Sequence, residues 1–392
     1  MTTTNTLDSN RTGEVLYLAL ELGDRSWKMA STVGLGQKAR HVDVSAADLG
    51  ALLREIAQAK RRFRLPADAP VWCCYEAGRD GFWMHRWLLE QGVASHVVDS
   101  ASIEVNRRQR RAKSDGLDAT KLVEMLVRYH RGETRVWRVV RPPTPEQEDA
   151  RHLHRELESM QHERRQLANR IAGLLVNVGV RAKVKVGFDR TLDLLRQPNG
   201  QPLPPHLRTR LEREYERWLL VHRQLLAAER ELKQRAQQEA EQSPACQRLV
   251  GLRGVGFKGT YVVLREGLVW REFRNGGQVG SMSGMTPTPY ASGTIDRELG
   301  IGKAGNARVR TLMVELAWGW LHYQPDSELT QWFYRRFAPG NGRSRKVGIV
   351  ALARKLLVAL WRLAVFGEVP RGAVCVDWRS KFTRAKLSTP IA

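Results

Sequence analysis

The chain has 392 residues, enough for two or three domains, and its 64 Lys plus Arg against 41 Asp plus Glu leave a net charge of +23. A chain as basic as this favours a polyanionic partner, and nucleic acid is the first candidate. A membrane surface is less favoured. Its four cysteines form no CxxC pair, which argues against a disulfide framework or a cysteine zinc site. With no signal peptide and no apolar run of about 18 residues, we expect a cytoplasmic, nucleoid-associated protein and no membrane partner.

Strands and helices alternate in the first part of the chain. Short apolar runs predict strands and helical apolar spacing predicts helices, at 15–22, 27–32, 47–62, 71–76, 82–91, 95–98 and 118–131. This alternation predicts an α/β layer architecture. Prolines 142, 143 and 145 mark its end.

A long helical region follows. Apolar residues recur at spacings of 4 and 3 from Leu153 to Leu174, interrupted by Arg164, and a second seam runs from Leu211 to Leu232. Such seams are typical of a coiled coil or a long helical hairpin, and the two helices can pair with each other or with another subunit. The remaining chain carries two glycine-rich stretches and helical segments at 307–322 and 347–366.

Two aspartates three residues apart, Asp115 and Asp118, follow a basic run. In a helix they would share a face, about 5–6 Å apart at Cβ. Two carboxylates at so short a distance repel each other unless a cation lies between them. Mg²⁺ is such a cation, because it prefers carboxylate oxygens as ligands. The basic run favours a phosphate-bearing substrate and comprises Arg107, Arg108, Arg110, Arg111 and Lys113. The alternative is a solvated helix start.

Two more acids come at the ends of predicted strands, Glu21 and Glu76. Ligands gather at the carboxyl ends of strands in an α/β sheet, so these acids and the aspartate pair could hold one or two Mg²⁺ ions for phosphoryl transfer. The structural alternatives are a surface partner for Arg25 in the case of Glu21 and an ion pair with Arg79 in the case of Glu76.

The stretch Gly254–Gly259 matches GxGxxG. A dinucleotide site needs a strand before this motif and an acid about 20 residues after it. The preceding segment resembles a helix, and Glu266 is too near. A helix-hairpin-helix turn, which can hold a nucleic-acid phosphate on backbone N–H groups, fits better, with Lys258 beside it.

Ser292 precedes a glycine in what we expect to be an irregular loop, exposed enough to act as a nucleophile. A simple turn is the alternative, and no histidine is near to act as a base. Residues that could bind a phosphate attacked by this serine are Lys303, Asn306, Arg308 and Arg310.

Together and in this order, these motifs resemble the insertion-sequence family 110 of transposases, including its 1111 group. The family's Lys-Thr-Asp-x-x-Asp-Ala is matched by residues 113–119, its Glu-Ala-Thr-Gly by 75–78, and its Pro-Gly-Ile-Gly hairpin by 253–256. Its Gly-Leu-x-Pro, Ser-Gly and Lys-x-Gly-Asn elements are matched by 284–287, 292–293 and 303–306. The likeness covers roughly residues 15 to 370.

The resemblance implies a RuvC/RNase H-like α/β domain at 14–141 after a tail at 1–13. It further implies a helical, coiled-coil oligomerisation region at 142–243, a mostly α transposase domain with a helix-hairpin-helix-like element at 244–370, and a basic tail at 371–392. The implied function is Mg²⁺-dependent DNA strand cleavage and exchange, guided by an element-encoded RNA. By this likeness Ser292 becomes a phosphoserine, the four acids hold Mg²⁺, and a homo-oligomer, dimer or tetramer, forms a composite site.

There are two departures from the family pattern, and the smaller is Ser114 in place of the usual threonine. The family's first aspartate falls on Glu21, whose longer side chain would shift the metal, and Asp24 is a possible substitute. Two rival functions stay open at this point. One is a RuvC-like junction nuclease that uses water as its nucleophile, and the other is a catalytically decayed nucleic-acid-binding protein.

Overall fold

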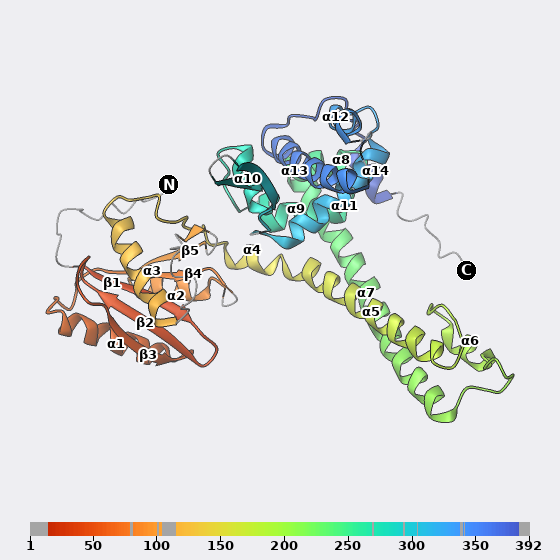
Figure 1. Cartoon of the computed structure of the whole chain (residues 1–392), viewed down its shortest axis with the longest axis horizontal. Coiled ribbons are helices and arrows are strands. Elements are labelled where there is room, and N and C mark those ends of the chain that lie inside the picture. The colour runs from red at the N-terminus through yellow and green to blue at the C-terminus, as the bar shows by residue number, and fades with distance from the viewer. Residues whose placement is uncertain are drawn as a thin grey trace. The chain divides into compact units, whose positions relative to one another are not determined.

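The computed structural model describes residues 15–78, 81–99, 102–103, 115–268, 270–292, 295–303, 305–337, 340 and 342–383. For 115–118, 288–292 and 295–299 it describes the backbone alone. The chain divides into two compact units, Met1–Thr144 and Pro145–Ala392 (Figure 1). In the described part of the chain, no helix is long and apolar enough to cross a membrane.

The first unit contains a five-stranded sheet of order β3-β2-β1-β4-β5. Strands β1, β2 and β3 pair antiparallel, whereas β4 and β5 extend the sheet parallel to β1. Their bounds are Leu16–Leu22 (β1), Ser26–Thr32 (β2), Arg40–Ser45 (β3), Val71–Glu76 (β4) and Ala94–Val98 (β5). The helices of this unit are Leu49–Arg62 (α1), Trp83–Glu90 (α2) and Asp115–His130 (α3).

The sheet is covered on both faces, because successive side chains of β1 alternate between two cores. Leu16, Leu18 and Leu20 belong to the core that includes buried residues of α1 and α2. Tyr17 and Ala19 belong to the core that includes α3. The predicted α/β layering is confirmed. Strand β3 was not predicted, because its sequence is polar and only Val44 in it is buried.

The second unit begins with Pro145–Asp149 (α4) and two long helices, His152–Val176 (α5) and Pro205–Gln242 (α7), with Phe188–Leu194 (α6) between them. Helices α5 and α7 lie side by side (Figure 1). Both predicted seams are buried in one core, Leu157 and Leu167 from α5 with Leu211 and Leu225 from α7. Within the chain, then, the two helices pair with each other.

The rest of the second unit is mostly helical and shares that core. Its elements are Pro244–Gly251 (α8), Phe257–Val263 (α9), the π-helical turn Leu264–Leu268 (η3), Gly276–Met282 (α10), the strands Pro287–Ser292 (β6) and Ile295–Ile301 (β7), and then Ala307–Tyr323 (α11), Glu328–Phe337 (α12), Gly342–Phe366 (α13) and Trp378–Thr383 (α14).

Residues 371–383, which were predicted to belong to a basic tail, pack against the rest of the second unit. The N–H of Val376 donates to Gly251 O at 2.7 Å, and the N–H of Arg253 donates to Val374 O at 3.0 Å. Phe382 of α14 is buried in the core. This segment therefore braces the turn between α8 and α9.

Candidate nucleic-acid processing site

Glu21 and Glu76 lie at the same end of two adjacent parallel strands. The register of β1 and β4 pairs Leu20 with Tyr75, so the two glutamates come next in line. Glu21 comes two residues after Ala19, and Glu76 comes two residues after Cys74. Both glutamates are therefore on the same face of the sheet as Ala19 and Cys74, which are buried in the core beneath α3. The structure therefore brings these two predicted acids together on the α3 side of the sheet.

Helix α3 runs opposite to β1 and begins near the two glutamates. Its last residue, His130, lies 2.6 Å from the hydroxyl of Tyr17 at the start of β1. Further along, the thiol of Cys74 lies 3.7 Å from Leu122 O. From this contact Glu76 is two residues on, about 6.6 Å along β4, and Asp118 is four residues back, about 6 Å along α3.

The backbone of Asp118 is thus level with Glu76, and Asp115 is the first residue of α3. The side chains of both aspartates lie outside the described residues. Within the described part of the chain no group of three or more metal-ligating side chains is found. The basic run that precedes the aspartates, Arg107 to Lys113, also lies outside the described residues.

A row of charged residues crosses the sheet at the level of Glu21. Lys28 of β2 is the register partner of Glu21, and Asp43 of β3 is the partner of Lys28. Lysine beside glutamate lowers the repulsion between the two glutamates and attracts an anion such as a phosphate. Asp24, the possible substitute for Glu21, is exposed in the turn that joins β1 to β2.

Ser292 is not in an irregular loop, contrary to our expectation. It is the last residue of β6, which pairs antiparallel with β7, and its register partner is Ile295. Pro287 and Pro289 argued against a strand. A two-stranded ribbon tolerates them, because every second N–H of each strand points away from the partner. The serine thus lies at the tip of a hairpin, which we call the serine hairpin (287–301).

Two of the three cations predicted to bind the phosphate attacked by Ser292 donate hydrogen bonds within the protein. Arg310 donates to Ser283 O and Lys303 O at 3.0 Å each, and Arg308 donates to Glu158 at 2.7 Å. The Asn306 side chain caps α11 by accepting from the N–H of Arg308 and of Val309. Asn306 and Arg310 therefore shape the segment after the serine hairpin. Lys303 is exposed, with a φ of +57°.

The glycine motif lies in a helix-turn-helix arrangement. Helix α8 precedes it and α9 begins directly after Gly256, so no strand stands where a dinucleotide site requires one. Gly254 has a φ of +87°, and a Cβ there would lie 2.9 Å from Cβ of Tyr323. Lys258 is exposed, with Nζ 3.2 Å from Oε1 of Gln161 on α5.

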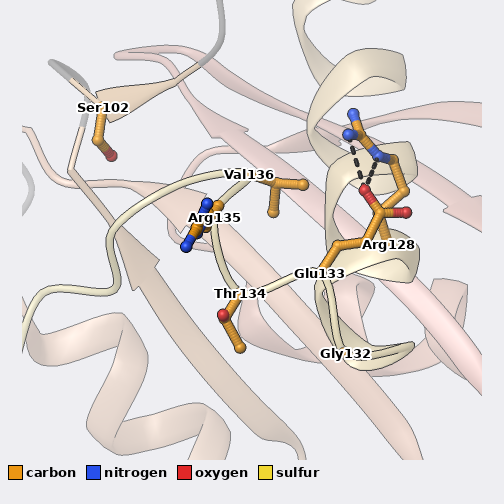
Figure 2. Close-up of a pocket in the computed structure, with 7 residues that line it drawn as sticks. All are labelled: Ser102, Arg128, Gly132, Glu133, Thr134, Arg135 and Val136. Atoms are coloured by element: carbon orange, nitrogen blue, oxygen red, sulfur yellow. Dashed lines mark hydrogen bonds and ion pairs between the residues drawn. The ribbon is translucent and has the colours of Figure 1, made fainter.

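A cavity of about 690 Å³ lies beside the other end of α3 (Figure 2). Its lining includes Arg128 and Glu133, which form an ion pair at 2.8 Å, and the exposed Arg135. Ser102 also faces it, but its hydroxyl already donates to Asp99 O. This cavity is at the opposite end of α3 from Asp115, so it is separate from the row of acids.

A buried acid of the second unit, bonded to three other side chains, was not predicted as a functional residue from the sequence. Glu266 is fully buried and accepts hydrogen bonds from His154, Arg155 and Asn306. A carboxylate inside the apolar run 262–270 was the available signal. Its partners could not be found in the same way, because they are 112, 111 and 40 residues away.

The comparisons with known proteins agree with these motifs. Residues 246–331 match the family model described as Transposase IS116/IS110/IS902 family. The chain is 41% identical over 375 residues to the protein named Putative transposase y4rJ of Sinorhizobium fredii, covering 92% of this chain and 94% of that one. It is 25% identical to the transposase for insertion sequence element IS1111A of Coxiella burnetii, over 73% of this chain and 76% of that one.

A further similarity is to the transposase for insertion sequence element IS1328 of Yersinia enterocolitica, 25% identical over 66% of this chain and 73% of that one. The first of these relatives matches nearly the whole chain and therefore extends over both units. The chain belongs to the IS116/IS110/IS902 family of transposases.

Proposed function

We propose that this transposase cuts and rejoins DNA with Ser292 as its nucleophile and with Glu21, Glu76, Asp115 and Asp118 as the holders of Mg²⁺, in a RuvC-like first unit. The observation that carries the proposal is the position of the acids along the sheet. Glu21 and Glu76 are adjacent in register on the α3 side of the sheet, and α3 begins at Asp115 beside them. Four acidic positions from three elements thus converge on one end of the sheet.

The donor chemistry fits magnesium. Carboxylate oxygens are the ligands that Mg²⁺ takes in phosphoryl-transfer sites, whereas a zinc site would need His or Cys. When bound, Mg²⁺ supplies positive charge that stabilises the phosphate oxygens as they gain charge. Glu21 can ligate in place of an aspartate, and Lys28 next to it adds a positive charge for the phosphate.

The serine step conserves the phosphodiester bond energy. The hydroxyl oxygen of Ser292 attacks phosphorus, a serine–phosphate bond forms, and the bond from phosphorus to a sugar oxygen breaks. The serine proton leaves to solvent and the released sugar oxygen takes up a proton. A hydroxyl of another DNA end then reverses the step and restores the serine. No ATP is needed, in agreement with the absence of a GxxxxGK[ST] motif from the sequence.

The charge of +23 supports two polyanionic partners, the DNA and an element-encoded guide RNA. Exposed cations in both units are available for them, Arg135 in the first and Lys258 and Lys303 in the second. Because the acids and the serine belong to different units, we further propose a homo-oligomer with a composite site. The α5 and α7 seams are filled within the chain, so such an assembly would use other surfaces.

The test is a search for a denaturant-stable adduct with DNA that carries the element ends, in the presence of Mg²⁺ and the adjoining non-coding RNA. We expect an adduct with the natural protein and none with Ser292→Ala. Tyr290→Phe is the matched control, because Tyr290 lies two residues earlier on the same strand and carries a hydroxyl of its own. An adduct that survives Ser292→Ala would refute the serine assignment.

The acids are tested separately with Asp115→Asn and Asp118→Asn. Each should abolish Mg²⁺-dependent cleavage while DNA binding in gel-shift assays is retained, because neither change removes a cation. Cleavage that persists in both variants would refute the metal role. Cleavage by the natural protein without any adduct would instead favour a junction nuclease that uses water.

A further inference from the structure

Glu266 occupies a buried polar cluster that touches the segment following the serine hairpin. Its Oε1 accepts from Nε2 of His154 at 2.8 Å and from Nε of Arg155 at 2.8 Å. Its Oε2 accepts from Nη2 of Arg155 at 3.0 Å and from Nδ2 of Asn306 at 2.8 Å. We call these four residues the Glu266 cluster.

The cluster keeps Glu266 charged in the protein interior. Burial raises the pKa of the Glu266 carboxyl, but the hydrogen bonds from His154, Arg155 and Asn306 outweigh burial and hold that pKa well below its usual range. A carboxylate can only accept, so Nε2 of His154 carries the hydrogen. The hydrogen bonds of a buried charge are strong and directional, which makes Glu266 a rigid anchor for its partners.

The anchored residue, Asn306, ends a series of backbone pairings that begins at the serine and has one register shift, between Pro287 and Thr288. Ser292 pairs with Ile295 and Pro287 with Ile301. Below the hairpin the N–H of Gly302 donates to Thr286 O and the N–H of Lys303 donates to Gly284 O, both at 3.0 Å. The N–H of Asn306 then donates to Met282 O at 2.7 Å.

The chain has little freedom at this end of the ladder. Gly305 has a φ of +138°, and a Cβ there would lie 2.5 Å from Met282 O and 2.7 Å from Gly284 N. Only glycine fits so close an approach of two backbones. The position of Asn306 therefore sets the base of the serine hairpin, and Glu266 sets the position of Asn306.

The other side of the cluster belongs to the start of α5. His154 and Arg155 are the tenth and eleventh residues of the second unit, which begins at Pro145. Tyr261 fixes the same segment by donating to Ala150 O at 3.1 Å. One carboxylate thus joins the segment that enters from the first unit to the base of the hairpin that ends at Ser292.

From these contacts we infer that Glu266 is a positioning residue for the serine hairpin, acting through the side-chain amide of Asn306. It does not touch the DNA. Its effect is to fix where the hairpin base lies relative to the start of α5, and hence where the serine can stand. The activity part of this inference rests on the proposed role of Ser292, but the positioning part is measurable without it.

The sharpest variant is Asn306→Asp. Aspartate caps a helix as well as asparagine does, so α11 keeps its N-terminal cap. The contact with Glu266 is lost, because two carboxylates then face each other. The rescuing double variant is Glu266→Gln with Asn306→Asp, in which the amide and the carboxylate exchange places. The hydrogen bond between the two positions is restored, although the one from Nη2 of Arg155 is lost. Glu158→Gln is the control, because it removes an exposed ion pair that also joins α5 to α11, while Glu158 makes no hydrogen bond to any member of the cluster.

The first measurement is hydrogen exchange of peptides from the serine hairpin in the full-length protein. We expect Asn306→Asp to speed exchange of these amides on the order of tenfold, with the double variant returning toward the natural rate and Glu158→Gln unchanged. Unchanged hairpin exchange in Asn306→Asp would overturn the inference, whether or not Ser292 is a nucleophile. Equal acceleration across the whole second unit would overturn it as well, because that outcome indicates general destabilisation.

The second measurement is the rate of adduct formation at saturating DNA, together with DNA affinity. Asn306→Asp should slow the adduct on the order of tenfold at unchanged affinity, and the double variant should recover it. An adduct that forms at the natural rate despite faster hairpin exchange would overturn the positioning of Ser292. If the natural protein forms no adduct at all, the proposed function fails, and hydrogen exchange still decides the role of Glu266.

Discussion

The hydroxyl of Tyr17 and Nδ1 of His130, 2.6 Å apart, tie the first residues of β1 to the last residue of α3. This contact fixes the direction of α3 across the sheet. Because α3 then runs back along β1, its first turn reaches the end of the sheet that carries Glu21 and Glu76. A hydrogen bond at one end of the unit thus supports the arrangement of acids at the other.

Replacing Tyr17 with phenylalanine should therefore destabilise the first unit by about 1 kcal/mol, the usual loss for one partly buried hydrogen bond. The measurement is the urea midpoint of the fluorescence transition of the first unit. Tyr334→Phe is the control, because Tyr334 is 44% exposed in the second unit. A midpoint equal to that of the natural protein would mean that packing alone holds α3 in place.

The sequence was enough to predict that Glu21 and Glu76 lie at the same end of the sheet, but it was not enough to predict the serine hairpin. Glu21 and Glu76 follow apolar strands, and the rule that strand ends gather ligands was enough to pair them. Ser292, expected in an irregular loop because a glycine follows it, instead ends strand β6, because pairing with β7 overrides that local signal. Secondary-structure propensity depends on one segment alone, whereas strand pairing also depends on a second segment, which cannot be identified from the sequence of the first.

The Glu266 cluster is a second feature that could not be predicted from the sequence. Of its members only Asn306 belongs to a sequence motif, and a carboxylate in an apolar run points equally to a misassigned helix face. Only the fold brings α5, η3 and the N-terminus of α11 together. Buried polar clusters are built from contacts between distant segments, so neither spacing nor composition reveals them.

The length of the Glu21 side chain gives a second prediction. Glu21→Asp restores the family residue and should keep Mg²⁺-dependent DNA cleavage within about threefold of the natural rate or raise it, because the carboxylate is retained. Glu21→Gln should lower the rate by roughly 100-fold or more, because a neutral amide binds Mg²⁺ weakly. Cleavage rates at saturating Mg²⁺ make the comparison.

Asp24→Asn and Glu90→Gln separate the alternatives for that site. If Glu21 is the ligand, Asp24→Asn should cleave like the natural protein, as should Glu90→Gln at the exposed end of α2. The reverse pattern, with Asp24→Asn inactive and Glu21→Gln active, would move the metal ligand into the turn after β1.

Two glycines in the turn before α9 should respond very differently to alanine. Gly254→Ala should lower stability by about 1–3 kcal/mol, because Gly254 has a φ of +87° and an added Cβ would lie 2.9 Å from Cβ of Tyr323. Gly256→Ala, two residues on, meets nothing within 4 Å and should cost less than about 1 kcal/mol. Thermal unfolding of the second unit measures both, and equal losses would contradict the strained turn.

Stability should fall on acidification because of His96. Burial, and then the nearby His85 and His130, lower the pKa of His96 from 6.5 to about 4. Above pH 6.5 the imidazole is neutral in both the folded and unfolded states, so its full contribution to stability is present. Between pH 6.5 and about 4 only the unfolded chain takes up the proton, so the free energy of unfolding falls with pH.

The loss between those limits should be at most roughly 3–4 kcal/mol, at about 1.4 kcal/mol per pH unit, and should level off below pH 4 as far as His96 is concerned. Urea unfolding of the first unit at pH 7, 6, 5 and 4 measures it. His96→Gln keeps a polar side chain that cannot be protonated. In this variant the change in the free energy of unfolding with pH should be smaller, by an amount that corresponds to the uptake of up to one proton. An unchanged slope would mean that His96 is solvated in the folded protein, and that the ring contacts with Trp72 and Tyr129 leave it open to water.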